Sequence, residues 1–598
     1  MSTGGKRNGS GQDRVNPKDH SRPSHISSAL MQFIIALATD YDSTIATNSK
    51  VEASTIAALE RLKASGRTLV LVTGRELPDL QAVFPQLEIF DRVVAENGAV
   101  LYRPDTRETL PLGEEAPVEL IRRLQKSGIP LSVGRSILAT VEPHEKVALE
   151  AIRELGLEMQ IIFNKGSVMI LPAGINKATG LVAALDELGL SSHNTVGVGD
   201  AENDHAFLRL CGVSAAVSNA LPSLKSECDI VTEQRAGAGV AELIERVLAD
   251  DLKSIARRRH AVSLAESSEG ETIPLRIGCV LLAAGSSGGG KSTFLMGLME
   301  RLCQCRYQYC SIDPEGDYDH MDGAVVLGTP QRAPKVKEVM ELLHSPRENA
   351  IVNLVSLPFA DRAVFVSELL PELIKLRGRT ARPHWVILDE AHHLFPTAND
   401  QAALALPEQV TGLIMATVAP RQIAQAALTR VDEVLVLGDR PQEIAGQVCR
   451  TLGEAEPPKL PHDLAKGVGV LWRRKDRTPQ TVRIIEPRQQ RQRHARKYAE
   501  GRLPESRSFY FRGPEGRLKL RAQNLTMFLQ MAEGVDEETW LHHLKAGDYS
   551  RWFRDCIKDD DLAKEAASIE LEHMDAEESL ARIRDAIQRR YAPPAEPA

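Results

Sequence analysis

Two aspartates near the N-terminus have the type and spacing of a phosphoryl-transfer site. Asp40 and Asp42 lie in the run D-Y-D-S-T, directly after the apolar stretch FIIALA. A carboxylate can attack phosphorus when a nearby cation offsets the charge of the phosphate, and a second carboxylate can move the protons. The run alone is weak evidence, because aspartate and threonine after a strand are also common turn formers and helix caps.

Three further runs supply the groups that such chemistry needs. T-G-R starts at Thr73 after the stretch TLVLV, Lys177 follows I-N and opens a helical pattern, and G-D-A-E-N-D starts at Gly199. Taken in this order, the four runs resemble the motifs of the haloacid dehalogenase superfamily. The run A-E-N-G-A-V-L-Y, from Ala95, resembles its Cof-like, IIB-type sugar-phosphatase branch. The resemblance covers roughly residues 33–248.

The resemblance implies a role for each of these residues. Asp40 would attack phosphorus and form an aspartyl-phosphate, and Asp42 would protonate the leaving alcohol and then deprotonate water. Thr73 would donate a hydrogen bond to the phosphoryl oxygens, while Lys177 would offset negative charge. The expected Mg²⁺ ligands are the carboxylates of Asp40 and Asp200 and the backbone carbonyl of Asp42. Asn203 and Asp204 would support this site.

A second set of residues is typical of ATP binding. The run G-S-S-G-G-G-K-S-T follows the strand pattern IGCVLLAA and opens a helical pattern, so its backbone amides can surround phosphates. About a hundred residues later, the strand HWVIL ends in an acidic pair, of which Glu390 could polarise the attacking water. The residues expected to bind Mg²⁺-ATP are Gly285, Gly290, Lys291, Ser292, Thr293 and Asp389.

Two more stretches make this second set similar to the HerA-FtsK group of P-loop ATPases, over about residues 273–487. SIDPEGDY follows one strand pattern, and LIMATVAPRQI places Thr417 at the end of another. The resemblance implies a ring-shaped homo-oligomer that moves nucleic acid or protein, with an arginine from a neighbouring subunit; Arg421 and Arg430 are the candidates. V-A-P stands where a glutamine often follows the sensor threonine, which weakens the implied coupling to DNA.

The elements that position these residues alternate between strands and helices in both regions. We therefore predict an α/β fold with two doubly wound parallel-sheet (Rossmann-like) domains, the first with a small α/β cap, and a helical C-terminal segment. Arg135, Asn164, Lys165 and Ser167 are polar cap residues that could contact a substrate, although such residues are more often simple surface. The predicted ranges are a disordered tail (1–30), a phosphatase domain (31–250, cap about 112–171), a linker (251–272), an ATPase domain (273–487), a basic and polar linker (488–523) and a helical region (524–598).

Composition limits the class of protein and the compartment that we expect for it. Its 598 residues carry a net charge of −8 and eight cysteines, which does not favour a disulfide scaffold or a chain that is basic throughout. No apolar run reaches the length of a membrane span, and the N-terminus lacks the apolar core of a signal peptide. We expect a cytoplasmic protein that does not enter a membrane.

The leading hypothesis is a bifunctional enzyme, a phosphatase for a phosphorylated small molecule joined to an ATPase. An alternative is a nucleic-acid-processing machine whose phosphatase domain cleans phosphorylated ends. A third interpretation, a P-loop kinase paired with an opposing phosphatase, is disfavoured by Glu390. In the C-terminal segment, Trp540 and Trp552 fit one apolar helical face, which favours docking against another domain or subunit. A substrate-binding role for His542 or His543 is the less favoured alternative.

Overall fold

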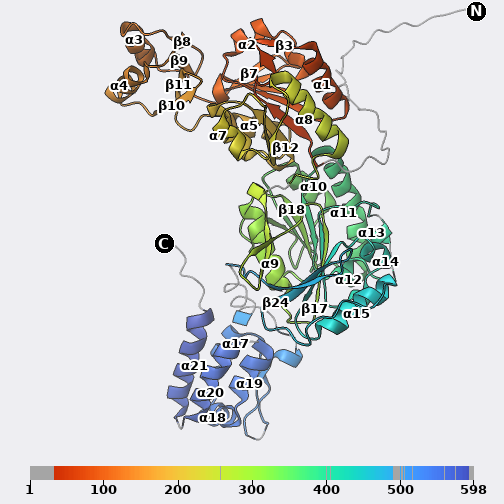
Figure 1. Cartoon of the computed structure of the whole chain (residues 1–598). Coiled ribbons are helices and arrows are strands. Elements are labelled where there is room, and N and C mark those ends of the chain that lie inside the picture. The colour runs from red at the N-terminus through yellow and green to blue at the C-terminus, as the bar shows by residue number, and fades with distance from the viewer. Residues whose placement is uncertain are drawn as a thin grey trace, which may run out of the picture.

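The computed structural model describes residues 33–255, 258–398, 401–404, 406–488, 498–499, 503, 505–514, 516–557, 559–572 and 574–591. The tail expected at residues 1–30 lies outside these ranges. The described chain forms a first α/β unit with a cap, a second α/β unit and a C-terminal unit, which follow one another along the molecule (Figure 1). Within the described residues, no helix combines the length and apolarity needed to cross a bilayer.

The first unit is built on an eight-stranded sheet. Its order is β14 (Ile230–Val231), β13 (Val213–Ala216), β12 (Thr195–Gly199), β1 (Ala36–Thr39), β4 (Thr68–Val72), β5 (Arg92–Ala95), β6 (Val100–Arg103) and β7 (Glu108–Pro111). The strands from β14 to β5 are parallel, and β6 and β7 form an antiparallel edge. All residues of β1 and β12 are buried, so helices must cover both faces of the sheet. The α/β, parallel-sheet prediction is confirmed for this unit.

Helices that follow these strands complete the first core. Helix α1 (Ala53–Ala64) packs beside α8 (Ala236–Asp250), and α5 (Lys177–Glu187) packs beside α6 (His205–Leu210). Asn176 caps α5 through its side-chain oxygen, which accepts the amides of Ala178 and Thr179. This N-capping contact fixes the first residue of the helix, Lys177, at the edge where β1 and β12 end.

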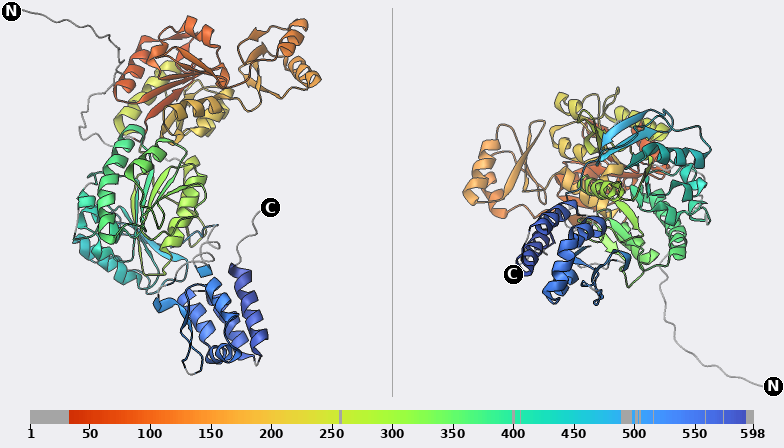
Figure 2. Two further views of the ribbon diagram at one scale, coloured as in Figure 1. Left: turned by 180° about the vertical axis from the view of Figure 1, so that it is seen from behind. Right: turned by 90° about the horizontal axis from the view of Figure 1, so that it is seen from below.

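The cap is a separate small layer beside this sheet (Figure 2). Its antiparallel sheet has the order β10 (Met159–Asn164), β11 (Ser167–Pro172), β9 (Leu138–Val141), β8 (Ser132–Val133), and it carries α3 (Val118–Lys126) and α4 (Glu145–Leu155). The cap has its own apolar core around Leu120, Leu124 and Ile170. The turn between β10 and β11 consists of Lys165, with φ 48°, and Gly166. This turn reaches the first unit's sheet edge, where the amide of Lys165 donates to Glu202 at 3.3 Å.

The second unit contains an eleven-stranded mixed sheet. Its order is β16 (Thr272–Pro274), β15 (Ser263–Ser267), β25 (Pro479–Arg483), β24 (Val468–Arg473), β23 (Glu433–Leu437), β17 (Val280–Gly285), β22 (Leu413–Thr417), β21 (Trp385–Leu388), β18 (Tyr309–Asp313), β20 (Ala350–Asn353) and β19 (Val325–Leu327). The strands from β23 to β19 are parallel, and the four at the other end are antiparallel. Strand β15 differs from the linker expected at residues 251–272, because it pairs with β25.

Helices cover both faces of this sheet, on which two separate apolar cores form. The helices include α9 (Lys291–Gln304), α10 (Val336–His344), α11 (Phe359–Thr380), α12 (Ala391–Leu394), α14 (Gln425–Leu428) and α15 (Pro441–Leu452). Helix α9 follows β17 after the glycine-rich loop, and the short α12 follows β21. The second unit thus brings the glycine-rich run and the acidic pair to the same edge of its sheet.

The two α/β units meet at the amino ends of their parallel strands. His384, just before β21, is hydrogen-bonded through Nε2 to the Oδ1 of Asn194, just before β12, at 2.9 Å. The ring of Tyr307 stacks on His193 with centroids 3.9 Å apart, and Arg382 donates to the carbonyl of Gly189 at 3.2 Å. The carboxyl ends of the strands, where open α/β sheets place their chemistry, therefore point away from the interface in both units.

The C-terminal unit has an aromatic core of its own. A hairpin of β26 (Phe509–Phe511) and β27 (Leu520–Ala522) packs on α17 (Leu525–Ala532), α18 (Glu537–Ala546), α19 (Asp548–Trp552), α20 (Asp560–Leu571) and α21 (Ala576–Tyr591). The hairpin lies in the range expected to be a polar linker, 488–523. His543 is buried, accepts the amide of Arg512 at 3.0 Å and pairs with Asp548, so it joins hairpin and helices. Trp540 and Trp552 are part of this internal core.

Candidate active site

The carboxyl edge of the first sheet gathers a buried charge cluster. Asp40, directly after β1, is 5% exposed, and its Oδ1 accepts a hydrogen bond from the Lys177 ammonium at 2.6 Å. The same ammonium donates to Oδ1 of Asp204 at 2.6 Å. The other oxygen of Asp204 accepts the amides of Asp200 and Ala201 at 2.8 and 2.9 Å. One lysine thus holds the ends of β1 and β12 together.

Burial sets the protonation of this cluster. Loss of hydration raises the pKa of Asp40 to about 7, although the Lys177 ammonium lowers it. Burial also raises the pKa of Asp200, and the ammonium of Lys165 opposes this rise. A further positive charge at the cluster would stabilise both carboxylates in their ionised form.

Carboxylates of this cluster could hold a metal ion. Asp40, Asp200 and Asp204 each offer one oxygen within 4.8 Å of the others. All three donors are hard oxygen atoms, which fits Mg²⁺ and not a soft transition metal. Asp204 already uses both oxygens to bond Lys177 and two backbone amides, so it fits a supporting role better than that of a direct ligand. Asp40 and Asp200 remain the residues best placed as ligands.

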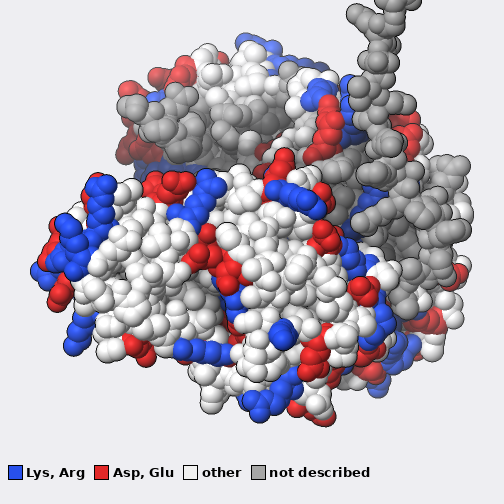
Figure 3. Space-filling view, turned by 90° about the horizontal axis from the view of Figure 1, so that it is seen from above, with Lys and Arg blue, Asp and Glu red and all other residues white. Residues whose placement is uncertain are grey.

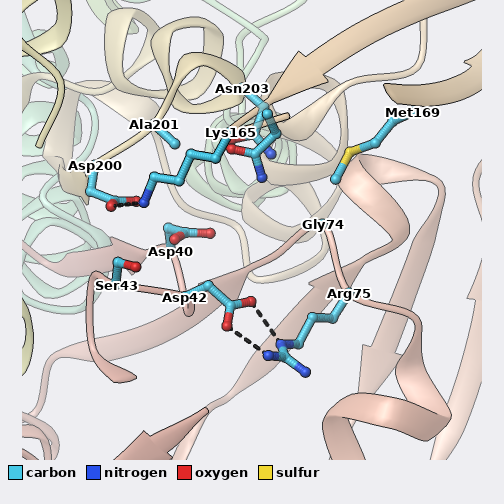
Figure 4. Close-up of a pocket in the computed structure, with 11 residues that line it drawn as sticks. Asp40, Asp42, Ser43, Gly74, Arg75, Lys165, Met169, Asp200, Ala201 and Asn203 are labelled. Atoms are coloured by element: carbon cyan, nitrogen blue, oxygen red, sulfur yellow. Dashed lines mark hydrogen bonds and ion pairs between the residues drawn. The ribbon is translucent and has the colours of Figure 1, made fainter. Parts of the chain in front are cut away.

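Asp42 is held by an arginine for which the sequence indicated no role. Arg75 donates to both oxygens of Asp42 at 2.7 Å and to Asp79 at 2.6 Å. Thr73 is fully buried, and its hydroxyl oxygen accepts the amide of Arg75 at 3.2 Å. The turn that carries Thr73 therefore also carries the partner of Asp42. The pairing fixes the Asp42 carboxylate beside the cavity but away from Asp40 (Figure 4).

Asn203 is tied to the run that begins at Ala95. Its Nδ2 donates to Oδ1 of Asn97 at 3.0 Å, and Asn97 is fully buried with φ 53°. Gly98 follows with φ 111°, and a Cβ there would lie 2.0 Å from the carbonyl oxygen of Asn176. The close approach requires glycine and brings this turn against the start of α5.

A cavity of about 160 Å³ opens onto the cluster. Figure 4 shows the residues that line it: Asp40, Asp42, Ser43, Gly74, Arg75, Asn164, Lys165, Met169, Asp200, Ala201 and Asn203. Of the four polar cap residues named from the sequence, Asn164 and Lys165 line the cavity. Arg135 instead lies near Glu115 at 3.4 Å, and Ser167 pairs with Val141 in the cap sheet. Seen from above, cap and core form two lobes, and acidic side chains gather in the hollow between them (Figure 3).

The second unit holds a separate candidate site. Gly290, with φ 94°, precedes α9, and the ammonium of Lys291 donates to the carbonyls of Gly285 and Ser286 at 3.2 and 2.9 Å. At Gly285 a Cβ would lie 2.5 Å from the carbonyl oxygen of Leu437. Thr293 lies in the first turn of α9. The Lys291 ammonium is thus bonded to the backbone of its own loop.

Acidic residues face this loop from neighbouring strands. The Ser292 hydroxyl donates to Asp317 at 3.3 Å, and the Tyr318 hydroxyl donates to Oδ2 of Asp389 at 2.6 Å. Burial, followed by repulsion from Asp389, raises the pKa of Glu390 to about 7. Asp317 and Tyr318 belong to the run SIDPEGDY, in which the sequence indicated no individual role.

The remaining residues expected near this site are placed less centrally. The Thr417 hydroxyl is hydrogen-bonded to His392 at 3.1 Å, which links β22 to α12. Arg421 is exposed, and Arg430 donates to the carbonyl of Glu408 at 3.2 Å. Both arginines lie on the segment that follows β22.

Comparison with known proteins matches the first unit. A family model described as haloacid dehalogenase-like hydrolase matches residues 37–137 and 132–244. A phosphoglycolate phosphatase of Methanothermobacter thermautotrophicus is 29% identical over 36% of this chain and 98% of its own length. Phosphoglycolate phosphatase 2 of Saccharolobus solfataricus is 30% identical over 36% of this chain and 92% of its own. A crystal structure of a haloacid dehalogenase-like hydrolase from Bacteroides thetaiotaomicron is 19% identical, with a TM-score of 0.32 over 36% of this chain and 98% of its own.

Proposed function

The chain belongs to the family of haloacid dehalogenase-like hydrolases, and on this premise we propose that its first unit is a magnesium-dependent phosphomonoesterase. The observation that carries the proposal is the buried ammonium of Lys177, bonded at 2.6 Å to both Asp40 and Asp204 beside Asp200. This arrangement keeps a carboxylate nucleophile at the base of a cavity with a counter-charge in place.

The reaction would proceed in two steps on Asp40. A carboxylate oxygen of Asp40 attacks phosphorus, the bond from phosphorus to the ester oxygen breaks, and Asp42 gives its proton to the leaving alcohol. Asp42 then takes a proton from water, whose oxygen attacks phosphorus and releases phosphate and the Asp40 carboxylate. Bound at Asp40, Asp200 and the backbone of Asp42, Mg²⁺ would neutralise charge on the phosphoryl oxygens.

Asp42 must leave Arg75 at least in part to perform this role. In the structure both of its carboxylate oxygens accept a hydrogen bond from Arg75. We infer that substrate entry releases the pair, because Arg75 and Asp42 both line the cavity. Thr73, fully buried at the same edge, would donate to a phosphoryl oxygen.

The substrate we propose is a small phosphorylated metabolite, with a phosphorylated acid such as 2-phosphoglycolate as the first candidate and sugar phosphates as the second. The support is the names of the relatives and a cavity that is lined by both the catalytic edge and the cap. The test measures phosphate release from 2-phosphoglycolate, sugar phosphates and p-nitrophenyl phosphate. Asp40→Asn should abolish release, and the exposed Asp105→Asn should not; wild-type rates in Asp40→Asn would refute the assignment.

We propose separately that the second unit hydrolyses ATP. Its support is the glycine-rich loop before α9 with Lys291 and Ser292, opposite Asp389 and Glu390 at the carboxyl ends of β17 and β21. ATP turnover that survives both Lys291→Ala and Glu390→Gln would refute this. Repeating the assay with double-stranded DNA at low and physiological salt tests the nucleic-acid alternative, and the sedimentation of the ATP-bound protein tests the implied ring.

A further inference from the structure

Lys165 joins the cap to the catalytic cluster. It stands at the turn between β10 and β11, and its ammonium forms an ion pair with Oδ2 of Asp200. Its backbone amide also donates to Glu202 at 3.3 Å. The Lys165 side chain is 41% exposed, whereas that of Asp200 is 1% exposed. A residue of the cap thus places a partly exposed cation against a buried carboxylate of the core.

The same carboxylate belongs to the three that could hold a metal ion. An ammonium and a divalent cation repel each other strongly at contact distance, and they compete for the same oxygen. Whenever Asp200 binds Mg²⁺, the Lys165 ammonium must therefore move away. Its stem remains anchored at the turn, so the ammonium stays within reach of the cavity that it already lines.

The other cations of this region already have carboxylate partners. Lys177 lies below the cavity with 1% exposure and bonds Asp40 and Asp204. Arg75, the second cation among the cavity-lining residues, bonds both oxygens of Asp42 and one of Asp79. Lys165 is thus the cavity-lining cation that metal binding would release. Beside it, the Oδ1 of Asn164 is buried without a hydrogen-bond partner.

The position of Lys165 in the cavity determines which part of a bound substrate it would contact. The phosphoryl group must lie against Asp40, on the core side, because that carboxylate attacks phosphorus. The rest of the substrate then points to the side lined by the cap, where Asn164, Lys165 and Met169 lie (Figure 4). A cation at that end favours an anion there.

We propose that Lys165 is the specificity-determining residue of the phosphatase. It would guard Asp200 until Mg²⁺ binds, and would then pair with a second anionic group, a carboxylate, on the leaving-group side of a small phosphomonoester. This inference rests on the proposed phosphatase function and goes beyond it by assigning the selection of substrate charge to one cap residue.

The test compares two esters of nearly equal size, 2-phosphoglycolate and 2-hydroxyethyl phosphate, in which a neutral hydroxymethyl group replaces the carboxylate. Lys165→Met should lower kcat/KM for phosphoglycolate by about 10- to 100-fold, the range expected for a charge-assisted hydrogen bond, and leave the neutral ester within about twofold. Lys165→Arg should retain part of the preference. Lys146→Met, at an exposed position on the cap helix α4, is the matched control.

A second readout does not depend on activity. Binding of Mn²⁺ alone, followed by electron paramagnetic resonance, should be several-fold tighter in Lys165→Met than in the wild type, because the competing ammonium is absent. Equal losses for both esters, or unchanged Mn²⁺ affinity, would overturn this inference alone, since Asp40→Asn would still separate active from inactive enzyme. If the wild type hydrolyses no ester, the proposed function fails and the inference fails with it.

Discussion

Replacing Lys177 with methionine should destabilise the first unit strongly and in a pH-dependent way. Lys177 is 1% exposed and makes two ion pairs at 2.6 Å, so Lys177→Met leaves Asp40 and Asp204 buried without their cation. Removing one partner of a buried ion pair costs roughly 3–5 kcal/mol. Since about 1.4 kcal/mol is a factor of ten, amide exchange in β1 and β12 should accelerate by about two orders of magnitude or more.

The pH dependence follows from Asp40. Its pKa is already raised to about 7 by burial, with Lys177 as the group that lowers it, so the variant's pKa lies higher still. The pKa of Asp in the unfolded chain is about 3.9, so the unfolded state binds fewer protons than the folded state between these values. Stability then falls as pH rises, and the difference from the wild type should be larger at pH 8 than at pH 5.

Hydrogen exchange with mass spectrometry on peptides from residues 33–72 and 194–204 measures this directly. Tryptophan fluorescence would not serve, since all four tryptophans lie beyond residue 380. The assay contains a chelator, so that no divalent cation replaces the missing charge. Lys126→Met, at an exposed cap position, should leave exchange unchanged. Equal protection in Lys177→Met and wild type at pH 8, or a greater loss at pH 5, would refute the reasoning.

Three further predictions concern other parts of the molecule. Gly98→Ala should lower the thermal midpoint of the first unit and its phosphatase rate, because a Cβ would lie 2.0 Å from the Asn176 carbonyl oxygen. The control Gly128→Ala, at φ 69° with no atom within 4 Å of the added Cβ, should lower the free energy of unfolding by only about 1–2 kcal/mol. Similar thermal midpoints for the two variants would contradict this prediction. Glu390→Gln should reduce ATP turnover by about 100-fold or more while phosphate release from esters stays at the wild-type rate, as measured in parallel assays. Burial is the main cause that holds the pKa of His384 well below its usual value, so lowering the pH below about 6.5 should weaken the contact between the α/β units. Amide hydrogen exchange in residues 189–195 and 305–309, corrected for the intrinsic effect of pH on the exchange rate, should then become faster. A corrected exchange rate that stays constant down to pH 5 would contradict this prediction.

The catalytic side chains that could be predicted from the sequence are those that directly follow strands. Asp40, Thr73 and Asp200 come directly after β1, β4 and β12, and parallel strands end at one edge, so their proximity follows from the fold class. The pairing of Asp42 with Arg75 depends on side-chain directions that spacing does not determine. Lys165 reaches Asp200 only because the cap hairpin docks on the core, a contact between residues 35 positions apart that no local pattern reveals.

Short strands account for the differences in the expected linkers. The strand β15, SLAES, and the hairpin strands β26 and β27 have three to five residues each, too few for a clear alternation of apolar and polar positions. They are fixed by pairing with distant strands or by the aromatic core around Phe509, Phe511 and Phe528. These contacts are specified by the whole fold, not by the segment itself.

The position of the interface limits how the two α/β units can act on one another. Asn194 and His384 meet at the amino ends of β12 and β21, and Asp200 and Asp389 follow the carboxyl ends of the same strands. At about 3.3 Å per residue, each strand carries its acidic residue roughly 17–20 Å away from the interface, in opposite directions. A coupling between the proposed ATPase and the proposed phosphatase would therefore run through the strands and the interface, whose contacts include those of His384, Tyr307 and Arg382. Those contacts are where a coupling between the two proposed activities should be sought.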